Sequence, residues 1–311
     1  MRIKIMITEK KINKQHTWVA INEPTQVEKE KLIHHYQVTD EMIGYAIDPN
    51  ERARIETDRD ANIFLLIFDV LSKDITASGS TEPIGIMLVN DYVLTFTRSS
   101  TEFVNTVFAR HLNNALLHSK EEVAPLTIIF RTLYELSVQY FDAVNNINRQ
   151  RQQIQKSMTH RISRKSISDM LGLETSLVYY LTSLRSNNAL LTSMNRMQEI
   201  QMTTGQHEQL EDVIVESQQG EEMAQLATDI IERVANANSN VLDSDLNNTM
   251  KFLTVFSIVL AVPSIVFGFF GQNVLVPFSH SIIGWELTIL ITVILILIVL
   301  LILNLNNFFK K

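Results

Sequence analysis

Two apolar runs near the end of the chain constrain its fold more than any other feature. The first, Phe252 to Phe270, contains no charged residue, and the second extends from Leu287 to Leu303. As helices, both runs are long enough to cross a hydrocarbon core of about 30 Å. The sequence therefore predicts a membrane protein with spans at residues 251–271 and 287–305, a short loop at 272–286 and a basic tail at 306–311.

A stripe of residues that are small or polar, except for Met250, extends along the first run and just beyond its two ends. Its members are Asn247, Met250, Thr254, Ser257, Ala261, Ser264, Gly268 and Gly271. Steps of three and four residues place such side chains on one face of a helix. Two interpretations remain open for this face. Small residues permit close helix packing in lipid, whereas hydroxyl and backbone carbonyl groups suit a pore wall that faces water and ions.

The same face continues upstream of the membrane run. Asn236, Asn240 and Asp243 extend the stripe by steps of three and four residues. Asn and Asp are mediocre helix formers, so a row of them on one face of a long helix requires an explanation. A solvated surface is the ordinary one. Continuity with the small-residue stripe favours a hydrated vestibule that leads to a pore.

The first span closes on Gly271-Gln272-Asn273, at the side of the short loop. With the junction at residues 246–254, the second span and the basic tail, this arrangement resembles the CorA-type magnesium transporters, whose first membrane helix closes on Gly-Met-Asn. The resemblance covers the overall layout of the chain. It implies a divalent-cation channel, for Mg²⁺ and also for Co²⁺ or Ni²⁺, formed as a homopentamer whose long stalk helices line a central path.

The resemblance also implies roles for single residues. Asn273 is expected to select the ion, because a neutral amide can hydrogen-bond the waters that Mg²⁺ retains without holding the ion too tightly. Met250 and Leu253 correspond to residues that form apolar pore constrictions, and Ala261 stands where relatives can have a bulky Met. Gln272 departs from the family's Met. A zinc-transporting branch of the superfamily departs there too, so zinc remains an alternative substrate.

A regulatory site is the next expectation from the resemblance. In family members, intracellular Mg²⁺ bound between subunits by acidic residues holds the channel closed. The corresponding positions are Asp48, in a segment that follows a helical stretch, and Asp212, with Glu211 beside it. Carboxylates with retained waters suit Mg²⁺. Single surface acids are nevertheless common, and solvated carboxylates are the plain alternative.

The distribution of charged residues predicts the membrane topology and the partners of the chain. Nothing at the N-terminus resembles a signal peptide, and Lys251, Lys310 and Lys311 flank the spans while the loop has no Lys or Arg. The positive-inside rule then places both termini in the cytoplasm and predicts a multi-pass protein of the cell membrane. Residues 251–311 hold three of the 27 basic and one of the 34 acidic residues, so the preceding part has nine more acidic than basic side chains. This balance argues against nucleic acid as a partner.

The part before the membrane divides in two. Residues 1–120 predict a mixed α/β domain, and residues 121–250 a helical region with a stalk. Expected strands are Arg2–Ile7, Thr17–Ile21, Arg54–Thr57, Ile63–Val70, Ile84–Val89 and Tyr92–Thr97, with a loop at Ala77–Pro83 and a turn at Asn90-Asp91. Expected helices are Gln26–Tyr36, Asp40–Ile47, Leu126–Met158, Ser166–Met202 and one from Gly205 into the first span.

The predicted fold class is therefore an α+β domain, with a mixed sheet and flanking helices, followed by a long stalk helix continuous with the first of two membrane helices. No phosphate-binding glycine loop, nucleophile elbow or zinc-protease motif is present, and no organic cofactor is expected. The chain is predicted not to be an enzyme. Besides the channel, a non-conducting membrane scaffold or sensor, with the stripe used only for packing, remains open.

Overall fold

The computed structural model describes residues 7–73, 80–118, 122–158, 164–197, 200–272 and 283–305, the side chains at 164, 238, 239, 241 and 242 excepted. The internal contacts divide the chain into two units, Met1–Ala235 and Asn236–Lys311. Each unit is described by itself.

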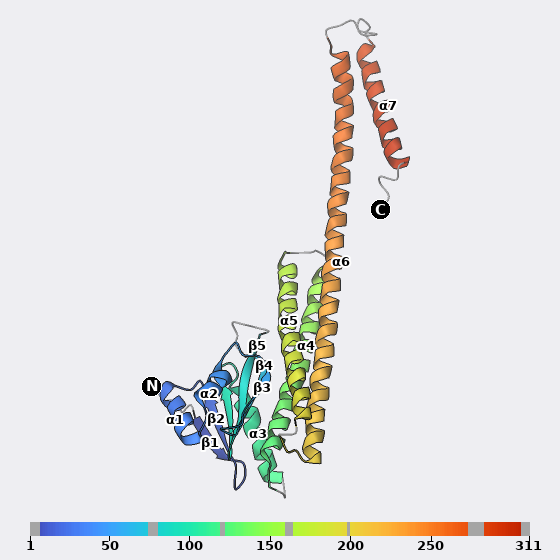
Figure 1. The fold of residues 1–311 in the computed structure, drawn as a ribbon. Helices are drawn as coiled ribbons and strands as arrows, with labels where there is room; N and C mark the ends of the chain where they lie inside the picture. Colours follow the sequence, from blue (N-terminus) through green and yellow to red (C-terminus); the bar gives the residue numbers. More distant parts are fainter. Residues whose placement is uncertain are drawn as a thin grey trace. The chain divides into compact units, whose positions relative to one another are not determined.

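The first unit contains a six-stranded mixed sheet (Figure 1). Its strands are β1 (Ile7–Lys11), β2 (Thr17–Asn22), β3 (Arg54–Asp58), β4 (Ile63–Leu71), β5 (Thr81–Val89) and β6 (Tyr92–Thr97). Their spatial order is β1-β2-β6-β5-β4-β3. Only the β2–β6 pair is parallel; the other neighbours are antiparallel.

The centre of the sheet is built from β4, β5 and β6. The β5–β6 hairpin closes at the Val89–Tyr92 pair through Asn90-Asp91, and Asn90 has a φ of 49°. Asn tolerates this left-handed conformation better than most residues do. β4 is buried on both faces along most of its length, as expected for an apolar strand with helices above and below it.

Two short helices cover one face of the sheet. α1 (Gln26–Tyr36) begins at a capping box in which Thr25 and Glu28 satisfy each other's backbone donors. Thr39 caps α2 (Asp40–Ile47). Their buried residues form one core with the sheet side chains of that face, including Leu65, Met87 and Leu94.

Longer helices cover the opposite face of the sheet. They are α3 (Phe103–His118), α4 (Pro125–Met158), α5 (Arg164–Arg196) and the first part of α6 (Thr204–Phe270). A second core joins side chains of all four helices to sheet residues such as Phe68 and Ile86. Beyond the sheet, α4 and α5 pack against α6 around a third core that includes Tyr140 and Leu184.

The second unit contains the rest of α6 and α7 (Gly284–Leu305). Asp243–Phe270 and Gly284–Leu305 are long and apolar enough to cross a membrane. α7 runs back beside the end of α6 (Figure 1). Val266 on α6 and Thr288 and Thr292 on α7 are buried there, so the two helices pack against each other through these residues.

The structure confirms the predicted fold class, and it corrects several boundaries. α3 was not predicted. β5 begins at Thr81, so the expected loop at Ala77–Pro83 is wrong for its last three residues. Pro83 is tolerated because β6 pairs with β5 only from Gly85 onward, which leaves no strand beside Pro83 on that side.

Other helix and strand ends also differ from their predicted positions. α5 ends at Arg196 rather than Met202, and α7 begins at Gly284 rather than Leu287. The predicted strand Arg2–Ile7 lies outside the described residues except for Ile7, which begins β1.

Candidate functional site

The predicted pore-lining residues all belong to α6. Each of them has an exposed side chain, or for glycine an exposed backbone, in the isolated chain. The set comprises Asn236, Asn240, Asp243, Asn247, Met250, Leu253, Thr254, Ser257, Ala261, Ser264 and Gly268. No element within the described part of the single chain covers this face. It is therefore available to water, to lipid or to another copy of the chain.

The hydroxyl groups of the stripe bond to their own helix. Thr254 and Ser257 donate to the carbonyl oxygens four residues earlier at 2.8 Å, and Ser264 does so at 3.2 Å. The hydroxyl hydrogen is thereby used inside the helix. What each group presents outward is an oxygen that accepts hydrogen bonds, which suits the water shell of a cation.

The face of α6 opposite the stripe has a different character. Val266 lies two residues from both Ser264 and Gly268, about 200° around the helix, and it is buried where α7 packs. Phe252 and Phe256 stack with ring centroids 6.3 Å apart and are 72% and 53% exposed. Exposed aromatic and aliphatic side chains of this kind suit lipid contact. Thus α7 leaves the stripe uncovered.

Gly271 closes α6 in a conformation that leaves no room for a side chain. Its N–H donates to the carbonyl oxygen of Phe267 at 2.8 Å, and an added Cβ would lie 2.9 Å from that same oxygen. By contrast, a Cβ at Gly268 would meet nothing within 4 Å. Gln272 is exposed, and Asn273 lies outside the described residues.

Asp48 follows α2 directly and is exposed. Its carboxylate accepts the N–H of Asn50 at 2.9 Å. Burial lowers the pKa of the nearby Arg98 guanidinium, while the charges of Glu82, Asp48 and Glu23 oppose that effect. Arg98 donates to the carbonyl oxygens of Ile47 at 2.8 Å and Pro83 at 3.0 Å. Asp48 therefore lies in the field of a guanidinium that is held in place by backbone groups.

Asp212 and Glu211 are exposed on the first part of α6. Asp212 lines a cavity of about 260 Å³ together with His111, Arg131 and Tyr134. α2 and α6 pack on opposite faces of the sheet, so a single chain does not bring Asp48 and Asp212 together. Among the described residues, no group of three or more His, Asp or Glu side chains is arranged to hold a metal ion.

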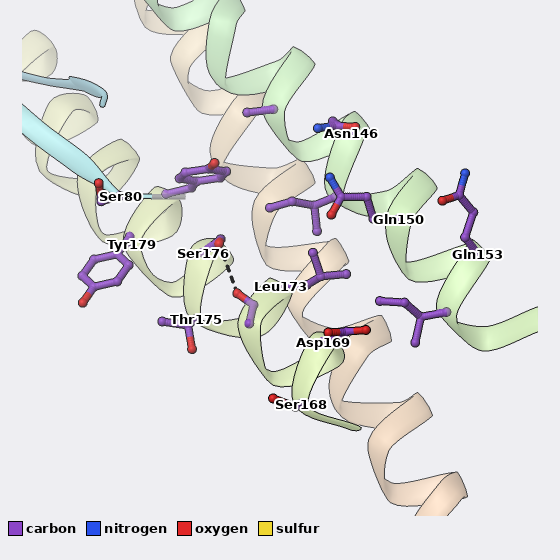
Figure 2. A pocket seen from close by; sticks show the side chains of 15 residues that line it. Ser80, Asn146, Gln150, Gln153, Ser168, Asp169, Leu173, Thr175, Ser176 and Tyr179 are labelled. Carbon is purple, nitrogen blue, oxygen red and sulfur yellow. Dashed lines mark hydrogen bonds between the residues drawn. The ribbon is translucent and has the colours of Figure 1, made fainter. Parts of the chain in front are cut away.

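A large cavity lies away from these residues. It measures about 1000 Å³ and lies between α4 and α5 (Figure 2). Asn146, Gln150 and Gln153 line it from α4, and Ser168 and Asp169 from α5. With amides, hydroxyls and a single carboxylate, this lining is neither a metal cluster nor a catalytic arrangement.

One polar cluster was not identified from the sequence. Asn187 accepts the backbone N–H of Asp69 at 3.0 Å and donates to its carbonyl oxygen at 2.9 Å, and Tyr140 donates to the same oxygen at 3.0 Å. Burial raises the pKa of the Asp69 carboxyl to about 6, against a hydrogen bond from Ser183 that lowers it. A single acid in the apolar strand Ile63–Leu71 was the available signal.

The fold and the stripe together define a class of protein. It is a two-span membrane protein in which a mixed-sheet domain and a helical hairpin precede one long helix that continues into the first span. Comparison with known families is consistent with this class. The family described as CorA-like Mg²⁺ transporter protein matches residues 13–310, and the chain belongs to this family. The family is one of transporters, not of enzymes.

Individual relatives share this fold at low sequence identity. The cobalt/magnesium transport protein CorA of Methanocaldococcus jannaschii is 22% identical over 284 residues, which cover 89% of this chain and 86% of that protein. The complete structure of the CorA magnesium transporter from the same organism matches with a TM-score of 0.83 at 21% identity, over 93% of this chain and 90% of that one.

Two further solved structures are more distant. The full-length CmaX protein matches with a TM-score of 0.72 at 12% identity, over 94% of this chain and 90% of that one. The cytoplasmic domain of ZntB from Vibrio parahaemolyticus matches with a TM-score of 0.62 at 10% identity, over 77% of this chain and 99% of that domain. At these identities the similarity shows the fold alone.

Proposed function

We propose that the protein is a divalent-cation channel with Mg²⁺ as its principal substrate and Co²⁺ and Ni²⁺ as further substrates. Several copies of α6 would surround a central path, each contributing the stripe from Asn236 to Gly268. Family membership and the uncovered polar face of α6 support this function. The relatives named for magnesium and cobalt transport are consistent with it.

The observation that carries the proposal is the orientation of the stripe hydroxyls. Thr254, Ser257 and Ser264 each donate inward to the helix, so that lone pairs face outward. Mg²⁺ dehydrates reluctantly and crosses a narrow path with waters attached. Those waters donate hydrogen bonds outward, because their oxygens face the ion. Neutral acceptors match them while binding weakly enough for the ion to leave.

We assign ion selection to the pore entrance formed by Gly271, Gln272 and Asn273. Gly271 gives the helix end its close backbone bond, and Asn273 would supply a ring of amide oxygens to the hydrated ion. Met250 and Leu253, each 54% exposed in the isolated chain, would form apolar constrictions that close the path by dewetting.

The assembly and topology follow the same proposal. A homopentamer in the cell membrane, with both termini in the cytoplasm, would place residues 1–250 inside the cell and residues 272–286 outside. Within that layout residues 1–120 form the sheet domain and 121–250 the helical region and stalk. Residues 251–271 and 287–305 span the bilayer and 306–311 form the tail. The absence of Lys and Arg between Gln272 and Glu286 supports this orientation.

Intracellular Mg²⁺ would regulate the channel at an interface between copies. Asp48 of one copy and Asp212, with Glu211, of the next are the proposed carboxylates, because one chain holds them on opposite faces of its sheet. The neighbouring Arg98 and Arg131 compete with the ion for these groups. A site of this kind is weak and suits sensing at millimolar rather than trace concentrations.

Zinc is the second candidate substrate. Gln272 replaces the Met of the magnesium-type motif, and the sheet domain and helices share their fold with the cytoplasmic domain of ZntB. A second amide beside Asn273 would add a neutral oxygen ligand. Such a ligand favours Mg²⁺ over Zn²⁺, so we rank zinc below magnesium.

The test is divalent uptake into proteoliposomes that contain the purified full-length protein. Mg²⁺, Co²⁺, Ni²⁺ and Zn²⁺ are compared for wild type, Asn273→Ala and the matched control Asn248→Ala, whose side chain lies off the stripe. We expect Mg²⁺ flux that falls at least about tenfold in Asn273→Ala and stays near wild type in the control. Flux of Zn²⁺ alone would transfer the assignment to zinc. No flux of any ion from a folded oligomer would contradict conduction and favour a scaffold.

A further inference from the structure

Met250 is chemically unlike the rest of the stripe to which it belongs. The other members, from Asn236 to Gly271, are amides, one carboxylate, hydroxyls, one alanine and glycines. Met250 alone carries a thioether, and it stands two residues before the apolar run begins at Phe252. A thioether is apolar, flexible and oxidisable. A single side chain of this kind within a long polar pattern points to a chemical role of its own.

The sulfur of Met250 is accessible in the chain, whereas other methionine sulfurs are shielded. Of the nine methionines within the described residues, five are buried, three are partly buried, and Met250 alone is exposed, at 54%. Methionine in a core fills gaps between apolar side chains, and Met250 has no such role in the isolated chain. An oxidant dissolved in water therefore reaches this sulfur before the others.

Met250 lies in a short apolar band on the exposed face of α6. Leu246, Met250 and Leu253 follow one another by steps of four and three residues, which places them on one side of the helix, and they are 63%, 54% and 54% exposed. Thr254 donates to the carbonyl oxygen of Met250 at 2.8 Å, so a hydroxyl oxygen follows the band directly. No aromatic residue stands three or four positions from Met250 to cover its sulfur.

The chemistry open to this side chain is two-electron oxidation by a peroxide. A lone pair of the sulfur attacks one oxygen of hydrogen peroxide, an S–O bond forms and the O–O bond breaks. The departing oxygen takes up the proton of the transferred one and leaves as water. Sulfur is thereby oxidised to a sulfoxide while the peroxide is reduced. The product is a polar side chain whose oxygen accepts hydrogen bonds.

We propose that Met250 is a site of reversible oxidation by peroxides, and that its sulfoxide prevents the path between copies of α6 from closing. This inference rests on the proposed function, in which Met250 forms an apolar constriction. Such a constriction closes by dewetting. Sulfoxide oxygens hold water at this level and present the same outward acceptors as Thr254 and Ser257. Oxidation therefore opens the constriction, and reduction of the sulfoxide restores it.

Peptide mass mapping tests the reactivity of the site. The full-length protein in detergent is treated with hydrogen peroxide, catalase stops the reaction, and the oxidised fraction of each methionine is followed with time. We expect Met250 to be converted at least about tenfold faster than Met223, a partly buried methionine of the same helix. Equal rates at the two positions overturn the proposal.

Uptake measurements test the effect on the path. Co²⁺ uptake is followed in proteoliposomes loaded with high internal Mg²⁺, and each oxidised variant is compared with its own untreated sample. We expect oxidation to raise uptake severalfold in wild type and in the control Met223→Leu. Met250→Leu, which retains an apolar side chain without an oxidisable sulfur, is expected not to respond. Methionine sulfoxide reductases for both sulfoxide epimers should reverse the rise.

The two measurements separate this inference from the proposed function. Uptake that is present but indifferent to complete oxidation of Met250 overturns the inference alone. A rise that persists in Met250→Leu overturns it as well, because the response then belongs to another residue. No uptake before or after oxidation, with Met250 fully converted in a folded oligomer, contradicts conduction itself and removes the inference with it.

Discussion

Asn187 on α5 takes the place of a strand beside Asp69 on β4. Its side-chain amide accepts the backbone N–H of Asp69 and donates to its carbonyl oxygen, at 3.0 and 2.9 Å. β3 pairs with β4 only as far as Ile67, so these two backbone groups have no strand partner on that side. Asn187 is fully buried, and one side chain thereby satisfies a backbone position that the sheet leaves open.

Replacement of Asn187 should therefore destabilise the first unit. In Asn187→Ala the buried N–H of Asp69 loses its partner, and its carbonyl oxygen retains only Tyr140. The expected cost is about 2–3 kcal/mol of unfolding free energy. Urea unfolding in detergent, followed by Trp18 fluorescence in a Trp285→Phe background, measures this cost. The exposed amide Asn146→Ala should change it by less than about 0.5 kcal/mol, and equal effects would contradict the strand-like role.

The Asp69 carboxyl should make stability depend on pH in mild acid. Its pKa in the folded chain is raised by burial to about 6, above the ordinary value of an unfolded Asp. The folded chain therefore binds this proton more tightly than the unfolded chain. The contribution of Asp69 to stability is greatest below about pH 4 and falls, by about 2 kcal/mol, as the pH rises to about 6.

Asp69→Asn isolates that contribution. Tyr140, which faces Asp69, and Tyr180, whose ring contacts that of Tyr140, have raised pKa values and stay neutral in this range. The stability of Asp69→Asn minus that of wild type, measured with the same fluorescence assay, should grow as the pH rises from about 4 to about 7. A difference that is constant with pH would show that Asp69 titrates near its ordinary value.

Gly271 and Gly268 should respond differently to the same methyl group. Gly271→Ala introduces a Cβ 2.9 Å from the carbonyl oxygen of Phe267, whereas Gly268→Ala meets open space. The helix end that carries the proposed mouth would shift in the first variant only. We expect Mg²⁺ uptake to fall severalfold in Gly271→Ala and to stay within about twofold in Gly268→Ala. Equal uptake by both would show that the close backbone contact is not needed.

The proposed regulatory carboxylates make a prediction about internal Mg²⁺. Proteoliposomes with high internal Mg²⁺ should show reduced uptake for wild type. The double variant Asp48→Asn/Asp212→Asn should be released from this inhibition, with its maximal uptake unchanged. Asp40→Asn/Glu208→Gln, which removes two other acids from α2 and α6, serves as the control. Inhibition that persists in the first variant would exclude these residues as the sensor.

Regular periodicity and turn residues made much of the fold predictable. The helices Gln26–Tyr36 and Asp40–Ile47 and the strand Tyr92–Thr97 have the expected bounds, because Thr25, Thr39 and Asn90 are local signals. α3 was missed although Val104, Val107 and Phe108 repeat with helical spacing and Ser100 and Thr101, common cap residues, stand just before its start. Arg196 ends α5 without any local stop, which only tertiary packing can determine.

The candidate site, like the fold, could be predicted from the sequence only in part. A helical stripe is a one-dimensional pattern, so the shared, exposed face from Asn236 to Gly268 could be predicted from spacing alone. The inward hydrogen bonds of Thr254 and Ser257 could not, because a hydroxyl's rotamer depends on its surroundings. The pairing of Asp69 with Asn187 joins residues 118 positions apart. No local pattern predicts such a pair, and the assignment of Asn273 and of the Asp48–Asp212 pair stays a prediction.

The Asn187 side chain that bonds to the backbone of Asp69 on β4 affects how copies of the chain can associate. An open strand segment normally offers a template on which another chain can add a strand, and unprotected edges promote aggregation. Here Asn187 occupies that template at Asp69. The two outer strands are short and bear charged residues, Lys10 and Lys11 on β1 and Arg54 and Glu56 on β3. Within the described residues, these features disfavour growth of the sheet by addition of a strand from another copy.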